Sequence, residues 1–214
     1  LPIKCIVSPP PLFYNPSTMD ISDNIRLLGN LLGKVISELE SPQLFEIEER
    51  IRALAKARRS GDVVAARQLQ ENVSSLKNSD ARVVAAAFAA YFDLVNLAEE
   101  DHRVQLLRQR ENDTFPEPVD ESIGEAVAFL KRSGVSAGEM SALMESLSIE
   151  LVLTAHPTEA RRRTILSKTE RIATQLSLLG HNGLYSYEKQ NAIDGLQAAI
   201  SALWLTDRAR ADKL

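Results

Sequence analysis

Apolar residues recur at intervals of three and four along most of this chain, the spacing that places side chains on one face of an α-helix. Such patterns run from Ile21 to Leu39, from Ser41 to Gly61 and from Val63 to Leu76, and each predicts one helix. A longer helix follows, which Ser79 or Asp80 can cap at its start. Its expected buried side carries Val84, Phe88, Tyr91, Phe92 and Val95.

The second half of the chain adds a different pattern. Two shorter helices are predicted, one across Ile123 to Leu130 and one opened by Ser136, with Glu139 at the spacing of a capping box. The run from Leu147 to Thr154 is instead short, apolar and β-branched, which predicts a buried strand over its later residues. A lone strand leaves its backbone groups unpaired. We therefore expect this strand to be short and poorly paired in this chain, or to borrow an edge from another chain.

A turn from this strand into a helix surrounds His156. Pro157 suits the first position of a helix, because its fixed φ is helical and the N–H that it lacks has no partner there. Helical spacing then predicts a helix from Thr158 to about Leu179, with Gly180 as its stop, and a last helix carries Ile193 to Trp204. His156 is thus placed beside the positive end of a helix dipole.

Positive charge follows the histidine directly. Arg161, Arg162 and Arg163 come within seven residues of it, so an anionic substrate is favoured at this turn. The structural alternatives are a core histidine satisfied by hydrogen bonds, solvated arginines, and a salt bridge from Arg162 to an acidic neighbour such as Glu159. Strand-end position and adjacent arginines favour a functional site over these alternatives.

The motif itself is specific. Thr154-Ala155-His156-Pro157-Thr158-Glu159, two variable residues, and then Arg162 and Arg163 resemble the histidine signature of phosphoenolpyruvate carboxylase. The resemblance covers roughly Met19 to Leu214, and members of that family are several times longer, so the sequence resembles the N-terminal portion of one. Further segments that resemble the family are Arg26–Gly29, Glu49–Ala55, Asn96–Glu99 with His102 and Arg103, and Leu203–Arg208.

The resemblance implies a fold. Phosphoenolpyruvate carboxylase is largely helical around an eight-stranded α/β barrel, and active-site groups of such barrels lie at the C-terminal ends of strands. We therefore expect a mainly α chain that holds the N-terminal helical part and the first strand-helix unit of the barrel. The expected regions are a proline-rich extended arm at 1–18, a helical region at 19–148 and the incomplete start of the barrel at 149–214.

The resemblance also implies an activity, in which phosphoenolpyruvate and bicarbonate give oxaloacetate and phosphate. His156 is then the catalytic residue, because an imidazole can donate or hold a proton near neutral pH, and Arg162 and Arg163 are candidate substrate-binding residues. Mg²⁺ is the implied cofactor, with its ligands outside this chain, and the complete protein is expected to be a homo-oligomer, a tetramer in the family. The 214-residue chain alone is expected to be inactive. The alternative is a catalytically inactive helical interaction or regulatory fragment.

Composition and charge limit the partners, the cellular compartment and the metal sites that are expected for the chain. A net charge of −4 argues against nucleic acid as a partner, because phosphate neutralisation needs a basic surface. A single cysteine, Cys5, favours a reducing compartment and hence the cytoplasm. No apolar stretch is expected to reach the length of a membrane span. His102 with Glu99, Glu100 and Asp101 permits a metal site, although a solvated charged face is the simpler interpretation.

Overall fold

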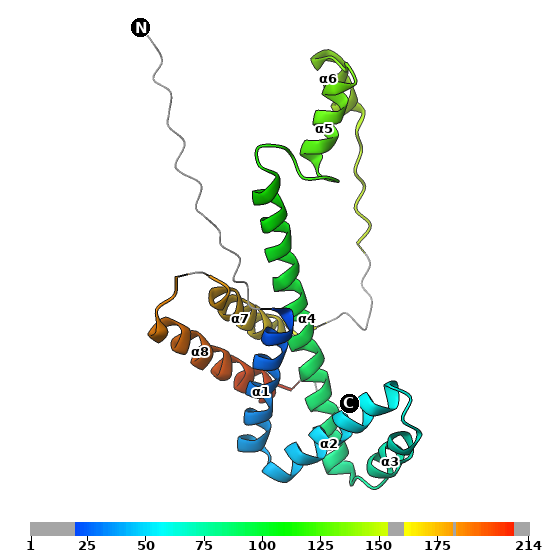
Figure 1. Cartoon of the computed structure of the whole chain (residues 1–214), viewed down its shortest axis with the longest axis vertical. Coiled ribbons are helices and arrows are strands. Elements are labelled where there is room, and N and C mark those ends of the chain that lie inside the picture. The colour runs from blue at the N-terminus through cyan, green and yellow to red at the C-terminus, as the bar shows by residue number, and fades with distance from the viewer. Residues whose placement is uncertain (1–19, 154–160, 182, 208–214) are drawn as a thin grey trace, which may run out of the picture. The chain divides into compact units, whose positions relative to one another are not determined.

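The chain is mainly helical, as predicted, in the part that the computed structural model describes, residues 20–153, 161–181 and 183–207. Those residues contain no strand, and their helices follow one another as drawn in Figure 1. The helices are α1 (Ile21–Leu39), α2 (Pro42–Arg59), α3 (Val63–Ser74), α4 (Asn78–Thr114), α5 (Ile123–Arg132), α6 (Ala137–Ser146), α7 (Arg163–Leu179) and α8 (Ser186–Trp204).

Two compact units make up the chain. The larger unit comprises residues 19–103 and 153–214, and the smaller unit comprises residues 1–18 and 104–152, so the division falls within α4. In the smaller unit, neither α5 nor α6 buries a residue completely, and Ile123 is 87% exposed. The larger unit holds the buried core and the arginines that follow the histidine motif.

Side-chain caps fix several helix starts. The Ser41 hydroxyl accepts the Leu44 N–H at 3.2 Å with Pro42 as the first helical residue of α2, as the sequence predicts. The capping box of α6 is confirmed, because Ser136 Oγ accepts the Glu139 N–H and Glu139 Oε2 accepts the Ser136 N–H at 2.8 Å. The predicted cap of α4 is wrong. That helix begins at Asn78, and the Ser79 hydroxyl donates to the Asp80 carboxylate instead of capping the backbone.

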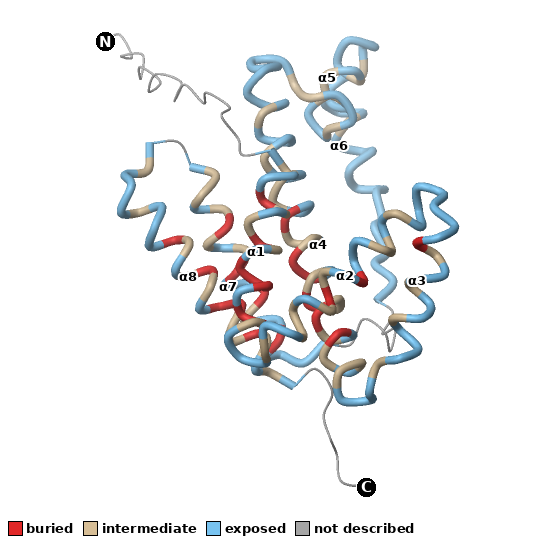
Figure 2. Tube along the Cα trace, turned by 60° about the horizontal axis from the view of Figure 1, so that its bottom comes forward, coloured by how far each residue is buried: buried red, intermediate tan, exposed pale blue. Residues whose placement is uncertain are grey.

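The core of the larger unit lies where α1, α4, α7 and α8 face one another, seen as the buried segments in Figure 2. α7 and α8 pack side by side along their lengths, and α1 packs on α8. At the rim of this core, the Trp204 indole N–H donates to Glu40 at 3.1 Å and Lys34 donates to Gln197 at 3.0 Å. The most deeply buried core side chains are Leu28, Val35, Ile36, Leu94, Ile172, Leu176, Leu196, Ile200 and Leu203.

The buried side of α4 agrees with the predicted one except at Phe92. Val84 is buried and Phe88, Tyr91 and Val95 are half-buried, but Phe92 is 60% exposed. The helix contributes Ala87, Ala90, Leu94 and Ala98 to the core. Phe92 lies two positions after Ala90, about 200° further around the helix, so the two cannot share a face. Small alanine side chains let neighbouring helices approach closely, and this packing outweighs the larger apolar area of the phenylalanine.

α4 also bears on the expectation about membrane spans. By length and composition it qualifies as a candidate, since an 18-residue window has a mean hydropathy of 1.4, which corrects the sequence-based expectation. One third of that window is buried inside the molecule. Length and composition alone are weak evidence, because the core helix of a globular protein passes the same test.

The buried core predicts that two leucines of α7 contribute differently to the free energy of unfolding. Leu176→Ala should lower the free energy of unfolding by about 2–5 kcal/mol, because Leu176 is 1% exposed and its removal leaves a cavity. Leu178→Ala, the same change two residues away at a 42% exposed position, should cost less than about 1 kcal/mol. Urea unfolding followed by circular dichroism measures both. Equal losses in the two variants would show that the α7 face is assigned wrongly.

Candidate functional site

The segment before the histidine motif is not helical. Residues 147–153 carry no regular structure, and Leu147 has an extended backbone with φ −69° and ψ 122°. The predicted strand is therefore absent over the residues of it that are described, because a strand needs a neighbour that supplies matching N–H and C=O groups. The apolar side chains of the segment lie open instead, with exposures of 56% for Leu147, 77% for Ile149, 80% for Leu151, 81% for Val152 and 94% for Leu153.

The histidine motif itself, His156 included, lies in residues 154–160, outside the described residues. The structure resumes at Arg161, which with Arg162 precedes the helix, so the predicted helix beginning at Thr158 is corrected to one that begins at Arg163. Arg162 is the N-cap, with φ −63° and ψ 138°, and its carbonyl oxygen accepts the first bonds of the helix, from the N–H groups of Ile165 and Leu166. Contacts of the two arginine side chains explain this late start.

Arg161 forms an ion pair with α4. Its guanidinium Nη1 lies 3.0 Å from Asp93 Oδ1, and the Asp93 side chain is 9% exposed whereas that of Arg161 is 44% exposed. A carboxylate so deeply buried is costly unless a cation and hydrogen bonds compensate it, so Asp93 favours this position of Arg161 strongly. The pair joins α4 to the chain five residues after the catalytic candidate.

Arg162 contacts the end of α8. Its Nη1 donates to the carbonyl oxygen of Asp207 at 2.6 Å. A guanidinium carries five N–H donors, so this bond, the one that Arg162 Nη1 makes to a described residue, leaves other donors for an anion. Arg163 is the exposed first residue of α7. The structure thus brings Arg161 and Arg162 to two different elements of the larger unit, and the predicted proximity of Arg162 or Arg163 to His156 stays a prediction.

Asp93 was missed by sequence reasoning. The signal lay in its spacing, because Asp93 follows Ala90 by three residues on the face where Ala87, Leu94 and Ala98 are buried. An acidic residue on an alanine-rich buried face requires a cation from elsewhere in the fold. The sequence offers many arginines, however, and only the folded chain shows that Arg161 is the partner.

The described residues do not form a metal centre. Among them, no group of three or more His, Cys, Asp or Glu side chains could hold a metal ion. The His102 ring is partly buried, and its Nδ1 has no hydrogen-bond partner within the described structure. The described residues therefore do not fit a Mg²⁺ site.

Comparison with known proteins gives a consistent result. The sequence profile of phosphoenolpyruvate carboxylase matches residues 21–214. Phosphoenolpyruvate carboxylase of Roseiflexus castenholzii is 40% identical over 194 residues, which is 90% of this chain and 21% of the relative. The enzymes of the same name from Pseudomonas paraeruginosa, 37% identical over 89% of this chain and 21% of the relative, and Acinetobacter baylyi, 36% identical over 90% and 22%, are similar to it as well. The chain spans about a fifth of the length of these curated relatives.

The ion pair between Arg161 and Asp93 predicts how well the first turn of α7 is protected from amide hydrogen exchange. Asp93→Asn should speed amide hydrogen exchange in the first turn of α7, at Ile165 and Leu166, because the segment that caps this turn loses its charged partner. Because Arg161 is half exposed, the loss of global stability should be only about 1 kcal/mol.

Asp207→Asn is the matched control. It makes the same chemical change beside the other arginine, yet Arg162 contacts the backbone carbonyl of Asp207, which this substitution preserves. Exchange measured by NMR should therefore be unchanged in the control. Equal protection of Ile165 and Leu166 in both variants would mean that Asp93 does not hold the segment.

Proposed function

Because this chain belongs to the phosphoenolpyruvate carboxylase family, we propose that it is the N-terminal portion of an enzyme that forms oxaloacetate and phosphate from phosphoenolpyruvate and bicarbonate. The observation that carries the proposal is the unbroken motif from Thr154 to Glu159 with Arg162 and Arg163 after it, within a profile match over residues 21–214. The enzyme class is a carbon-carbon lyase.

His156 is the proposed catalytic residue. In this reaction, bicarbonate attacks the phosphoryl group to give carboxyphosphate and the enolate of pyruvate, and the carboxyl group then passes to the enolate carbon with release of phosphate. Every species on this path is an anion, so a group that donates or holds a proton near neutral pH stabilises the transfer. An imidazole is the side chain whose ordinary pKa suits that role.

Arg162 and Arg163 are proposed to bind the anionic substrate. The bond from Arg162 to the Asp207 carbonyl supports this role, because it orients the guanidinium and uses one of five N–H donors, so others can bind a carboxylate or phosphate. Arg161 is excluded from the proposal, since its charge is paired with Asp93 at 3.0 Å. The ion pair instead anchors the chain just before Arg162.

The apolar segment from Leu147 to Leu153 is proposed to be the first strand of the family's α/β barrel. Its high exposure supports this, because apolar side chains that stay open in the chain alone are those that a neighbouring strand and helix layer cover. α7 follows it in chain order, as the helix of a strand-helix unit does. We propose in addition a tetrameric complete protein in the cytoplasm.

Mg²⁺ is proposed as the cofactor of the complete enzyme on family grounds alone. It would supply electrophilic stabilisation of the reacting anions. The described residues offer no set of ligands for it, so no step of the reaction is assigned to it in this chain.

The second candidate function is an inactive interaction or regulatory fragment that retains the motif. The helical core of the larger unit, which packs independently of any barrel, favours this alternative. Sequencing beyond the codon of Leu214 discriminates the two. A continuation that supplies further barrel strands with acidic and basic side chains favours the enzyme, and a stop codon favours the fragment.

The 214-residue chain alone should not carboxylate phosphoenolpyruvate. One histidine and two arginines cannot orient two anions and a metal ion at once. A coupled assay for oxaloacetate with protein purified from a host that lacks its own carboxylase measures this. Robust turnover by the chain would contradict the assignment of most catalytic groups to other parts of the enzyme.

His156→Asn should abolish carboxylation with little loss of substrate binding when this sequence replaces the matching N-terminal part of the Roseiflexus castenholzii relative. Asparagine keeps polarity and approximate size but removes the titratable ring, so kcat should fall by about 100-fold or more while KM changes less than about 3-fold. His181→Asn, at an exposed position after α7, is the control and should retain activity. Wild-type turnover by the His156 variant would make that histidine structural.

A further inference from the structure

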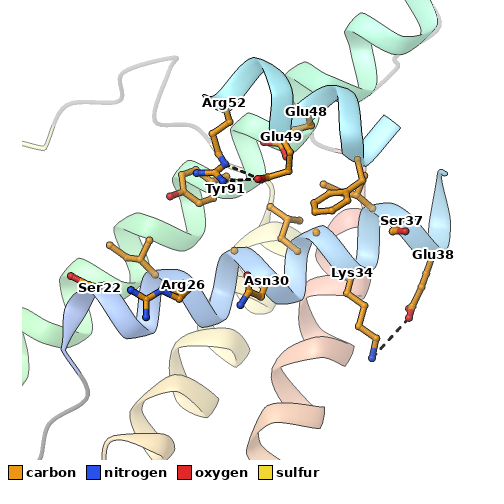
Figure 3. Close-up of a pocket in the computed structure, with 16 residues that line it drawn as sticks. Ser22, Arg26, Asn30, Lys34, Ser37, Glu38, Glu48, Glu49, Arg52 and Tyr91 are labelled. Atoms are coloured by element: carbon orange, nitrogen blue, oxygen red, sulfur yellow. Dashed lines mark hydrogen bonds and ion pairs between the residues drawn. The ribbon is translucent and has the colours of Figure 1, made fainter. Parts of the chain in front are cut away.

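A groove runs along α1 on the side of the larger unit that faces α2, as drawn in Figure 3. It has a volume of about 690 Å³ and is lined by α1 between Ser22 and Glu38, by α2 between Phe45 and Arg52, and by Tyr91 of α4. Arg161, Arg162 and Arg163 are not among the described residues that line the groove. What it binds is therefore a separate question from the carboxylase proposal.

The α2 wall of the groove is unusual for a packed helix. Phe45, Glu48, Glu49 and Arg52 follow one another at the spacing i, i+3, i+4 and i+7, so they form one stripe directed at α1. An apolar side chain normally occupies each position of such a stripe, but three of these four are charged. Glu48 is the most deeply placed of them, at 7% exposure.

Most charges that line the groove already have partners. Arg52 donates to both carboxylate oxygens of Glu49, with its Nε 2.8 Å from Oε1, and these bonds are dashed in Figure 3. On α1, Arg26 pairs with Asp23 at 3.0 Å, and Lys34 donates to Gln197 and lies 3.9 Å from Glu38. Glu48 differs from all of these, because it lies beside another carboxyl group, that of Glu49, and the nearby Arg52 bonds to both oxygens of Glu49.

This placement leaves Glu48 holding a proton near neutral pH. Burial, together with the negative charge of Glu49, raises the pKa of Glu48 from 4.5 to about 7 despite the opposing effect of Arg52. The folded pKa lies above the unfolded one, so the stability that this group contributes is present below about pH 4.5 and is lost as the pH rises through about 7. A positive charge placed beside Glu48 would replace the proton and remove this penalty.

Two aromatic side chains of the groove could contact the apolar part of a positively charged organic ligand. The rings of Phe45 and Tyr91 both line the groove, and aromatic faces attract ammonium and guanidinium groups. Gly33 forms part of the floor, and a Cβ on it would lie 2.5 Å from the Phe45 ring, so the ring rests directly on the backbone of α1. The ring is therefore held in place by packing on a rigid helix before any ligand arrives.

From these observations we infer that the groove is a binding site for a small organic cation, an alkylammonium or guanidinium group that pairs with the Glu48 carboxylate between the rings of Phe45 and Tyr91. Glu48 lies deep in the groove, and its neighbouring cation, Arg52, is already bonded to both carboxylate oxygens of Glu49, so a positively charged ligand would complete the charge balance. The two rings specify its apolar part.

The experiment titrates the 214-residue chain with n-butylammonium chloride and methylguanidinium chloride and follows amide shifts by NMR. Both probes should shift the amides of Gly29, Gly33 and Phe45–Arg52, and 1-butanol, a neutral probe of similar shape, should not. Potassium chloride at equal concentration removes general effects of ionic strength. Equal shifts with 1-butanol would overturn the inference in favour of a merely apolar groove, and shifts with n-butyrate alone would overturn it in favour of an anion site.

Glu48→Gln is the diagnostic variant, because glutamine resembles the protonated glutamic acid in shape and removes the negative charge. It should weaken binding of both probes by about tenfold or more. Glu38→Gln makes the same change at the exposed end of the groove, where the Glu38 side chain is 53% exposed, and should change binding less than about twofold. Equal weakening in the two variants, or unchanged binding in Glu48→Gln, overturns the inference.

The pH dependence of wild-type binding is a second test that needs no variant. Only the ionised form of Glu48 pairs with a cation, so both probes should bind about tenfold more tightly at about pH 8 than at about pH 6. The other charged or titratable groups of the groove are Glu49 and Arg52 on α2, Arg26, Lys34 and Glu38 on α1, and Tyr91 on α4. Affinity that is flat across this range overturns the assignment to Glu48.

Discussion

Leu28 of α1, Leu176 of α7 and Leu196 of α8 are each at most 1% exposed, and they belong to the one core of the larger unit. Burial of these side chains fixes which face of α1 points inward. The neighbouring side of α1 then forms the floor of the groove toward α2, and Leu32 and Ile36 belong to both the core and the groove lining. The same core includes α4 and α8, and the arginines after the histidine motif contact Asp93 of α4 and the Asp207 carbonyl just after α8.

The larger unit holds two buried acidic residues, Asp93 and Glu48, whose charges are compensated in different ways. Asp93 is buried and paired with Arg161, so its cost is offset within the chain and the result is an anchored backbone. Glu48 is equally buried but shares a proton with another carboxyl group, so its cost is offset only while that proton stays. The first carboxylate serves local structure, and the second leaves a site whose charge a ligand can complete. Neither role follows from burial alone, since both residues are almost inaccessible.

Most of the helices could be predicted from the sequence, because each buries a stripe that recurs every three or four residues and several carry side-chain caps such as Ser41 and Ser136. The exposed position of Phe92 on α4 could not, since apolar area alone favours Phe92 over Ala90 and only the neighbouring helices decide between them. The β-forming side chains from Leu147 to Thr154 predict a strand, but pairing depends on partners that the described residues do not provide. At the site, the positive charge was predictable, whereas the partners Asp93 and Asp207 are distant in sequence.

The open segment from Leu147 to Leu153 also bears on the solubility of the chain. Its described residues carry no regular structure and expose apolar side chains, and identical copies of such a segment can pair with one another as strands. Glu150 is the one charged residue within it, at the centre of Leu147–Leu153, and like charges brought together in a stacked ribbon repel. That single carboxylate therefore opposes self-association of the exposed segment.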